Sequence, residues 1–167
     1  MPRSMGGSND DSNLQVLCRT CNAQKRNNDD TDFRAVNSSY DRREEGCPFC
    51  DAWDRIDQEN ELAFVINDGH AVTPGHSLII PRRHVEDYFD LHQSERNAID
   101  RLLRSRRESL MSSDDRIEGF NVGVNAGAVA GQTVLHVHVH LIPRRLGDVD
   151  DPSGGVRAVI PERQKYP

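Results

Sequence analysis

Three histidines occupy alternate positions of one short segment, His136-Val137-His138-Val139-His140. Alternate side chains of a β-strand share a face, so we expect the three imidazoles on one side and the valines in the core. Neighbouring histidines on that face stand about 6.6 Å apart, twice the strand rise. Such a row suits an extended substrate better than a single metal held at about 2.0 Å. Two alternatives stay open: a solvent-exposed strand face, and a zinc site made by two of the histidines.

Four cysteines form two C-x-x-C pairs, Cys18 with Cys21 and Cys47 with Cys50. A tetrahedral zinc site accepts cysteine pairs at this spacing. The first eleven residues lack the apolar region of a secretory signal, and no stretch approaches the roughly 20 apolar residues that span a bilayer. We therefore expect a cytoplasmic protein without membrane contact, whose cysteines are metal ligands or free thiols rather than disulfides.

The chain alternates between short apolar runs and turn signals, with one helical segment. Strands are expected at 62–66, 77–80, 120–124 and 135–142, and a helix capped by Ser94 is expected to run to about Asp114. This order predicts an α+β domain with an antiparallel sheet rather than βαβ units. The 167 residues suffice for one domain with a small appendage.

The composition argues against one class of function. Hydrophobic residues make up 35% of the chain and the formal net charge is −6. A protein that coats nucleic acid needs a basic surface to neutralise phosphates, so nucleic acid is not an expected partner. A local pocket for one small polyanion remains compatible with this charge.

Two stretches closely resemble the signature blocks of the histidine-triad family. They are Asn125–Arg144, which contains the alternating histidines, and Asn67–His84. The run from Gly147 to Pro161 is similar to the tail of bacterial members of the Fhit-like branch, which hydrolyses dinucleoside polyphosphates. The resemblance covers roughly Cys47 to Pro167, and it implies a sheet that pairs edge to edge with a second copy in a homodimer.

The resemblance also assigns a mechanism. His138 would attack the α-phosphorus and give a nucleotidyl-histidine intermediate that water then resolves. A neutral imidazole is a competent nucleophile near pH 7 if its other nitrogen is held as a donor, and we expect a backbone carbonyl to hold it. The related nucleotidyltransferase branch carries Gln at the position of His140, so a histidine here favours transfer to water.

Further site residues follow from the same resemblance. The expected catalytic set is His138, His140 and Gln132, and His76 is expected to make a structural hydrogen bond. The expected substrate contacts are Asn67 at the ribose hydroxyls and Asn125, Gln132, Thr133 and His140 around the phosphates. A divalent cation such as Mg²⁺, bound with those phosphates, is a further expectation.

The second cysteine pair resembles a zinc knuckle found in some histidine-triad proteins. By this resemblance Cys47, Cys50, His84 and His136 would hold one structural zinc in a closed Cys₂His₂ site. Two buried free thiols are one alternative. A four-cysteine site that includes Cys18 and Cys21 is another, although 25 residues between the pairs exceed the usual spacing.

Residues 1–46 differ from the remainder and resemble the second half of an HNH endonuclease module. The histidine that would activate the metal in such a module lies upstream of that half, so nuclease activity is not expected. We expect a remnant and linker, or a start codon placed inside a longer frame. Residues 47–167 would then form the catalytic domain.

The sequence thus predicts a hydrolase of dinucleoside polyphosphates or related nucleotide conjugates that releases a nucleoside monophosphate. One alternative is a nucleoside phosphoramidase of the same family. Another is a non-catalytic protein that binds nucleotide or nucleic acid.

Overall fold

The main helix packs on the sheet through its apolar side chains, and a capping box stabilises its amino end. The computed structural model describes residues 40–166, in which α3 runs from Gln93 to Ser113. Its cap is His92 and not the expected Ser94, because the Glu95 carboxylate turns back to accept the His92 N–H at 2.8 Å. Ser94 instead lies buried and is hydrogen-bonded to Tyr40. No helix among residues 40–166 is long and apolar enough to cross a membrane.

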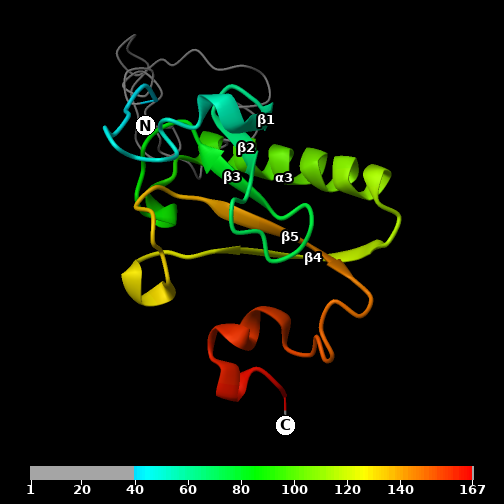
Figure 1. Ribbon diagram of the computed structural model, residues 1–167. Coiled ribbons are helices and arrows are strands. Elements are labelled where there is room, and N and C mark those ends of the chain that lie inside the picture. The colour runs from blue at the N-terminus through cyan, green and yellow to red at the C-terminus, as the bar shows by residue number, and fades with distance from the viewer. Residues whose placement is uncertain (1–39, 167) are drawn as a thin grey trace, which may run out of the picture.

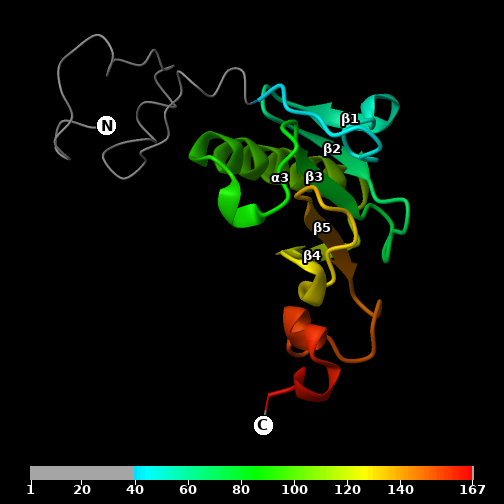
Figure 2. The same cartoon turned by 90° about the vertical axis from the view of Figure 1, so that its left-hand side faces the viewer.

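Within residues 40–166, five antiparallel strands form one sheet in the order β1-β2-β3-β5-β4. Their bounds are β1 Ile56–Glu59, β2 Ala63–Asn67, β3 Ser77–Pro81, β4 Ile117–Val124 and β5 Val139–Arg145. With α3 lying across the sheet, this architecture confirms the α+β fold (Figures 1 and 2). β1 was not expected from the sequence, because its residues Ile-Asp-Gln-Glu offer a single apolar side chain.

The two faces of the sheet bury different groups of residues. One face packs on α3 through Val65, Ile79, Leu141 and their neighbours. The other face packs on the segment around Cys47 and Cys50, and its members are Phe64, Ile66, Leu78 and Ile80 together with Phe49 and Ala52. Because strand residues alternate between faces, this division decides which side chains can reach the histidines.

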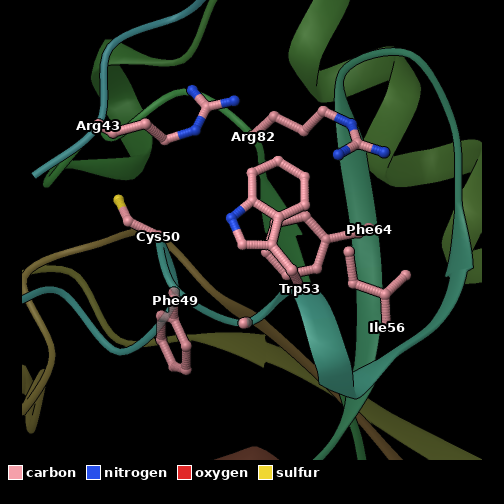
Figure 3. A pocket seen from close by; sticks show the side chains of 8 residues that line it. Arg43, Phe49, Cys50, Trp53, Ile56, Phe64 and Arg82 are labelled. Atoms are coloured by element: carbon pink, nitrogen blue, oxygen red, sulfur yellow. The ribbon is translucent and has the colours of Figure 1, made fainter.

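Trp53 is exposed and lies beside the second core, the group of residues around Cys47 and Cys50. The guanidinium groups of Arg43 and Arg82 lie 5.8 and 5.7 Å from its ring centre (Figure 3). The pocket here is also lined by Phe64 and Cys50, but its volume of about 10 Å³ fits little more than one water molecule. It is therefore part of the packing beside Cys50 and not a place for a nucleotide.

Strand β5 is shifted from the expected 135–142: it begins at Val139 instead of Leu135 and continues through Pro143 to Arg145. Its partner β3 ends at Pro81, and the Val137 N–H donates instead to the carbonyl of Val85 at 2.8 Å. The alternation nevertheless continues through this extended segment, since Val137 is buried in the helix-side core. The three histidines therefore share the opposite face even though two of them precede the strand.

A buried arginine fastens α3 to the sheet. Arg106 donates from Nε to the Ser77 hydroxyl at 2.9 Å and from Nη2 to the Asn67 side-chain oxygen at 2.6 Å. Its Nη1 lies 2.6 Å from a carboxylate oxygen of Asp57. Buried charges need such partners, so these contacts fix the helix against β1, β2 and β3.

Candidate functional site

His138 is held by the main chain of the residue two positions before it. Its Nδ1 lies 2.8 Å from the carbonyl oxygen of His136, and since a carbonyl only accepts, Nδ1 carries the proton. This confirms the expected backbone carbonyl. The Phe49 ring stands edge-on at 5.1 Å between centroids and limits the ring's rotation. The lone pair of the neutral imidazole is therefore on Nε2, where a nucleophile needs it.

His140 follows on the same face, with its ring centre 5.2 Å from that of His138. Its Nδ1 lies 3.0 Å from Nε2 of His76, a buried residue on the turn before β3. Burial lowers the pKa of both His76 and His140. Both rings therefore favour the neutral form. Together they are a pair of histidines in hydrogen-bond contact beside His138.

The loop before the histidines is shaped by Gln132. This side chain is buried, accepts the Gly127 N–H at 2.7 Å and donates to the Glu86 carbonyl at 2.8 Å. Its hydrogen bonds thus hold the loop in shape. Thr133 is exposed beside it, and the Asn125 amide donates to the Gly131 carbonyl at 3.4 Å across the same loop. Gly127 and Gly131 have φ of +86° and +87°, a conformation that glycine adopts readily.

Asn67 does not join the other predicted site residues. It continues the face of Ala63 and Val65, and its side-chain oxygen accepts from Arg106 of α3. Asp68 continues the opposite face, and its carboxylate lies 3.4 Å from His76 Nε2 and 3.9 Å from His140 Nδ1. Sequence reasoning missed Asp68, although counting alternate positions from the apolar residues of β2 would have placed it on the histidine side.

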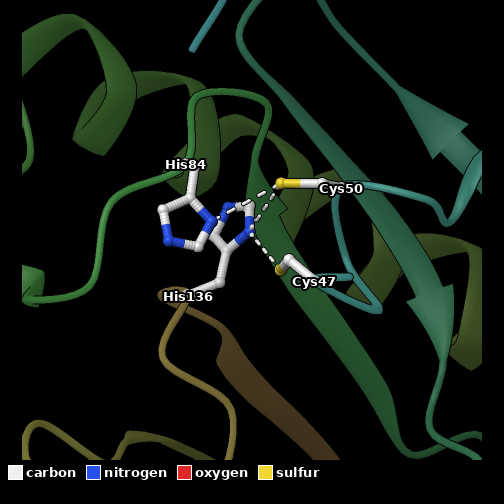
Figure 4. Close-up of side chains that lie close together, drawn as sticks. All are labelled: Cys47, Cys50, His84 and His136. Carbon is white, nitrogen blue, oxygen red and sulfur yellow. Dashed lines mark hydrogen bonds between the residues drawn. The ribbon is translucent and has the colours of Figure 1, made fainter. Parts of the chain in front are cut away.

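Cys47, Cys50, His84 and His136 lie together in the second core, and all four are buried (Figure 4). The Sγ atoms of Cys47 and Cys50 lie 3.4 and 3.7 Å from His136 Nδ1. Cys50 Sγ lies 3.5 Å from Nδ1 of His84. Tetrahedral zinc with Zn–N near 2.0 Å and Zn–S near 2.3 Å would separate these atoms by about 3.5 Å, so the arrangement fits the metal.

A second observation supports this fit. Nε2 of His136 donates to the Pro81 carbonyl at 2.9 Å, which leaves the lone pair on Nδ1, the atom that faces the thiols. Burial lowers the pKa of His136 to about 4, so the ring is neutral at pH 7, as a ligand must be. Cys18, Cys21 and the HNH-like segment lie outside the described residues.

Two family models match separate parts of the chain. The HIT domain family model matches residues 53–147, and an HNH endonuclease model matches residues 1–36. An uncharacterized HIT-like protein of Mycoplasma genitalium is 36% identical over 86 residues, which are 52% of this chain and 60% of that protein. The chain thus spans about 60% of the length of such curated relatives.

Two further proteins are similar in sequence or in structure. A Dictyostelium discoideum bis(5'-adenosyl)-triphosphatase is 33% identical over 104 residues, 62% of this chain and 69% of that protein. The crystal structure of a Zn-bound histidine triad family protein from Mycobacterium smegmatis aligns with a TM-score of 0.57 and 30% identity. It covers 62% of this chain and 78% of that one. With its fold, its row of histidines and a family model that matches more than half of its residues, the chain belongs to the HIT domain family.

Proposed function

We propose that this protein hydrolyses dinucleoside polyphosphates, or related nucleotide conjugates, by covalent catalysis at His138. The observation that carries the proposal is the bond from His138 Nδ1 to the His136 carbonyl, which leaves Nε2 as an unprotonated nucleophile. The similarity to a bis(5'-adenosyl)-triphosphatase supports this substrate class.

Two displacements complete the reaction. Nε2 of His138 forms a bond to the α-phosphorus while the bond from phosphorus to the leaving oxygen breaks, and the electron pair departs with the leaving nucleotide. Water then attacks the same phosphorus and loses a proton, the P–N bond breaks, and a nucleoside monophosphate is released. The His136 carbonyl stabilises the positive charge that the imidazole carries while the P–N bond exists.

Neutral donors surround the attacked phosphate in this proposal. His140, Thr133 and Asn125 contact the phosphate oxygens, and Gln132 keeps the loop in the required shape. Asp68 takes the role first expected of Asn67, because its carboxylate is on the histidine side and can accept hydrogen bonds from the sugar hydroxyls.

Zinc is proposed as a structural component. Cys47, Cys50, His84 and His136 would hold it and leave no open coordination position, so it takes no part in bond making. When bound, it ties the chain around Cys47 to the segment just before His138 and so stabilises the nucleophile's position.

Product analysis tests the proposed reaction. A diadenosine polyphosphate and adenosine phosphoramidate are incubated separately with the wild type and with His138→Ala, with and without Mg²⁺. We expect the wild type alone to split the polyphosphate into AMP and the remaining nucleotide. Turnover of the phosphoramidate alone would move the substrate class to the phosphoramidases, and nucleotide binding without turnover would favour the non-catalytic alternative.

A further inference from the structure

His76 is placed so that its tautomer is determined by the backbone. Its ring is 4% exposed, and its Nδ1 lies 3.3 Å from the backbone nitrogen of Val72. A backbone N–H can only donate, so Nδ1 of His76 accepts this hydrogen bond. The single proton of the neutral ring is consequently on Nε2.

That proton is directed at the second histidine of the pair. Nε2 of His76 lies 3.0 Å from Nδ1 of His140 and 3.4 Å from the Asp68 carboxylate. The shorter distance makes His140 the better placed acceptor. If Nδ1 of His140 accepts, then the proton of the neutral His140 ring is on Nε2.

We propose that His76 is a positioning residue that fixes His140 in the Nε2–H tautomer, so that His140 meets the substrate phosphate as a neutral hydrogen-bond donor. The phosphate part of this inference rests on the proposed function, whereas the tautomer does not. Neighbouring histidines of one face then take opposite forms: His138 keeps a lone pair on Nε2, and His140 keeps a proton there. The group that contacts Nδ1 makes this difference: it is the His136 carbonyl oxygen for His138 and the His76 N–H for His140.

The surroundings favour the neutral pair. Burial lowers the pKa of both rings, and the nearby His138 lowers that of His140 further. Asp68 acts in the opposite direction and also lies within reach of both rings. A neutral His140 ring with its proton on Nε2 can donate a hydrogen bond from that atom to a phosphate oxygen.

A metal ion is the competing explanation for this cluster, because one atom from each of Asp68, His76 and His140 lies within 4.8 Å of the others. A metal at His76 Nε2 would need the lone pair there, which moves the ring proton to Nδ1. That nitrogen already faces the Val72 N–H, so two donors would meet at 3.3 Å. The backbone therefore favours the hydrogen-bonded pair over a metal site.

Nitrogen-detected NMR of the full-length, ¹⁵N-histidine-labelled protein at pH 7.5 tests the proposal without any turnover. We expect the Nε2–H tautomer for His140 and the Nδ1–H tautomer for His138, and the same pair in His76→Gln, whose amide N–H can replace the donor. His76→Leu should lose the single tautomer of His140, whereas His70→Leu, at an exposed histidine, should keep it.

Three results would overturn the proposal: an Nδ1–H tautomer of His140 in the wild type, an unchanged tautomer in a folded His76→Leu, or displacement of the ring proton of His76 by added Zn²⁺ or Co²⁺. The wild-type spectrum decides the matter even if His76→Leu does not fold. Where the wild type turns over substrate, His76→Leu should lower kcat on the order of 100-fold and His76→Gln should restore most of it. An inactive wild type with the expected tautomers would refute the proposed function and leave this inference standing.

Discussion

The histidines of the site differ in chemistry because each ring has one nitrogen hydrogen-bonded to a different group. The Pro81 carbonyl leaves the lone pair of His136 on Nδ1, facing the thiols, and the His136 carbonyl leaves that of His138 on Nε2. The alternating pattern in the sequence predicted the shared face. It could not predict the tautomers, because groups far apart in the chain, such as Pro81 and His76, set two of them.

Two neighbouring residues test the assignment of the sugar contact. Asp68→Asn should raise KM several-fold, because the amide oxygen still accepts but a hydrogen bond to a charged group, about 1.5–3 kcal/mol, becomes a neutral one of about 0.5–1.5 kcal/mol. Asn67→Ala should leave KM within about twofold and lower the free energy of unfolding by roughly 1–2 kcal/mol, because Arg106 loses an acceptor. Steady-state kinetics and urea denaturation measure both; a larger change of KM in Asn67→Ala than in Asp68→Asn would contradict the assignment.

The hydrogen-bonded pair of buried His76 and half-buried His140 predicts an acid-sensitive fold. Their pKa values are lowered in the folded protein, so the unfolded chain binds more protons once the pH falls below the ordinary value of 6.5. The contribution of these two rings to the free energy of unfolding is therefore complete above pH 6.5. It decreases as the pH falls from there toward their lowered pKa values. Urea denaturation at pH 7.5 and 5.5 should show a smaller loss for His76→Gln than for the wild type. An equal loss in both proteins would contradict this account.

At the scale of elements, alternation between the faces of the sheet proved more informative than strand bounds. The face of the histidines was predicted although two of them precede β5, because extended chain keeps the same alternation without ladder pairing. Asn67 was placed by its match to a family pattern, and the parity of β2 turns it toward α3. The polar strand β1 depends on its pairing with β2, a tertiary contact that no local pattern predicts. The cap at His92 is local, but His is not among the usual capping residues, so Ser94 was the more obvious candidate.

The metal site joins two of these elements and predicts a response to zinc removal. We expect one zinc held by Cys47, Cys50, His84 and His136, and its removal by a chelator should lower Tm by roughly 10 °C. Metal analysis and thermal denaturation measure this. His84→Ala should lose that zinc and His70→Ala should keep it. Zinc retained in His84→Ala but lost in Cys18→Ser would instead indicate the four-cysteine site.

For the whole molecule, the sheet has one long open edge. Among residues 40–166, β4 pairs only with β5. A groove of about 510 Å³ between β4 and α3 is lined by Leu103, Met111, Phe120 and Val122. An unpaired edge with apolar neighbours favours association, and we expect a second copy to pair there.

Light scattering after size-exclusion chromatography tests the dimer. The wild type should have about twice the chain mass of 18.8 kDa. Val122→Lys should shift it toward monomer, and Val129→Lys, at an exposed valine outside β4 and outside the groove, should not. A monomeric wild type would contradict the expectation.

The central claim is that His138 becomes covalently bonded to the nucleotide, and rapid acid-free quenching followed by mass spectrometry tests it most directly. The protein is mixed with excess diadenosine polyphosphate, denatured within milliseconds in alkaline buffer, in which phosphohistidine bonds survive, and digested. We predict one adenylyl group on the peptide that contains His138, found in the wild type and in Thr133→Ala but not in His138→Ala. Turnover without any such adduct, or an adduct on His140, would contradict the account.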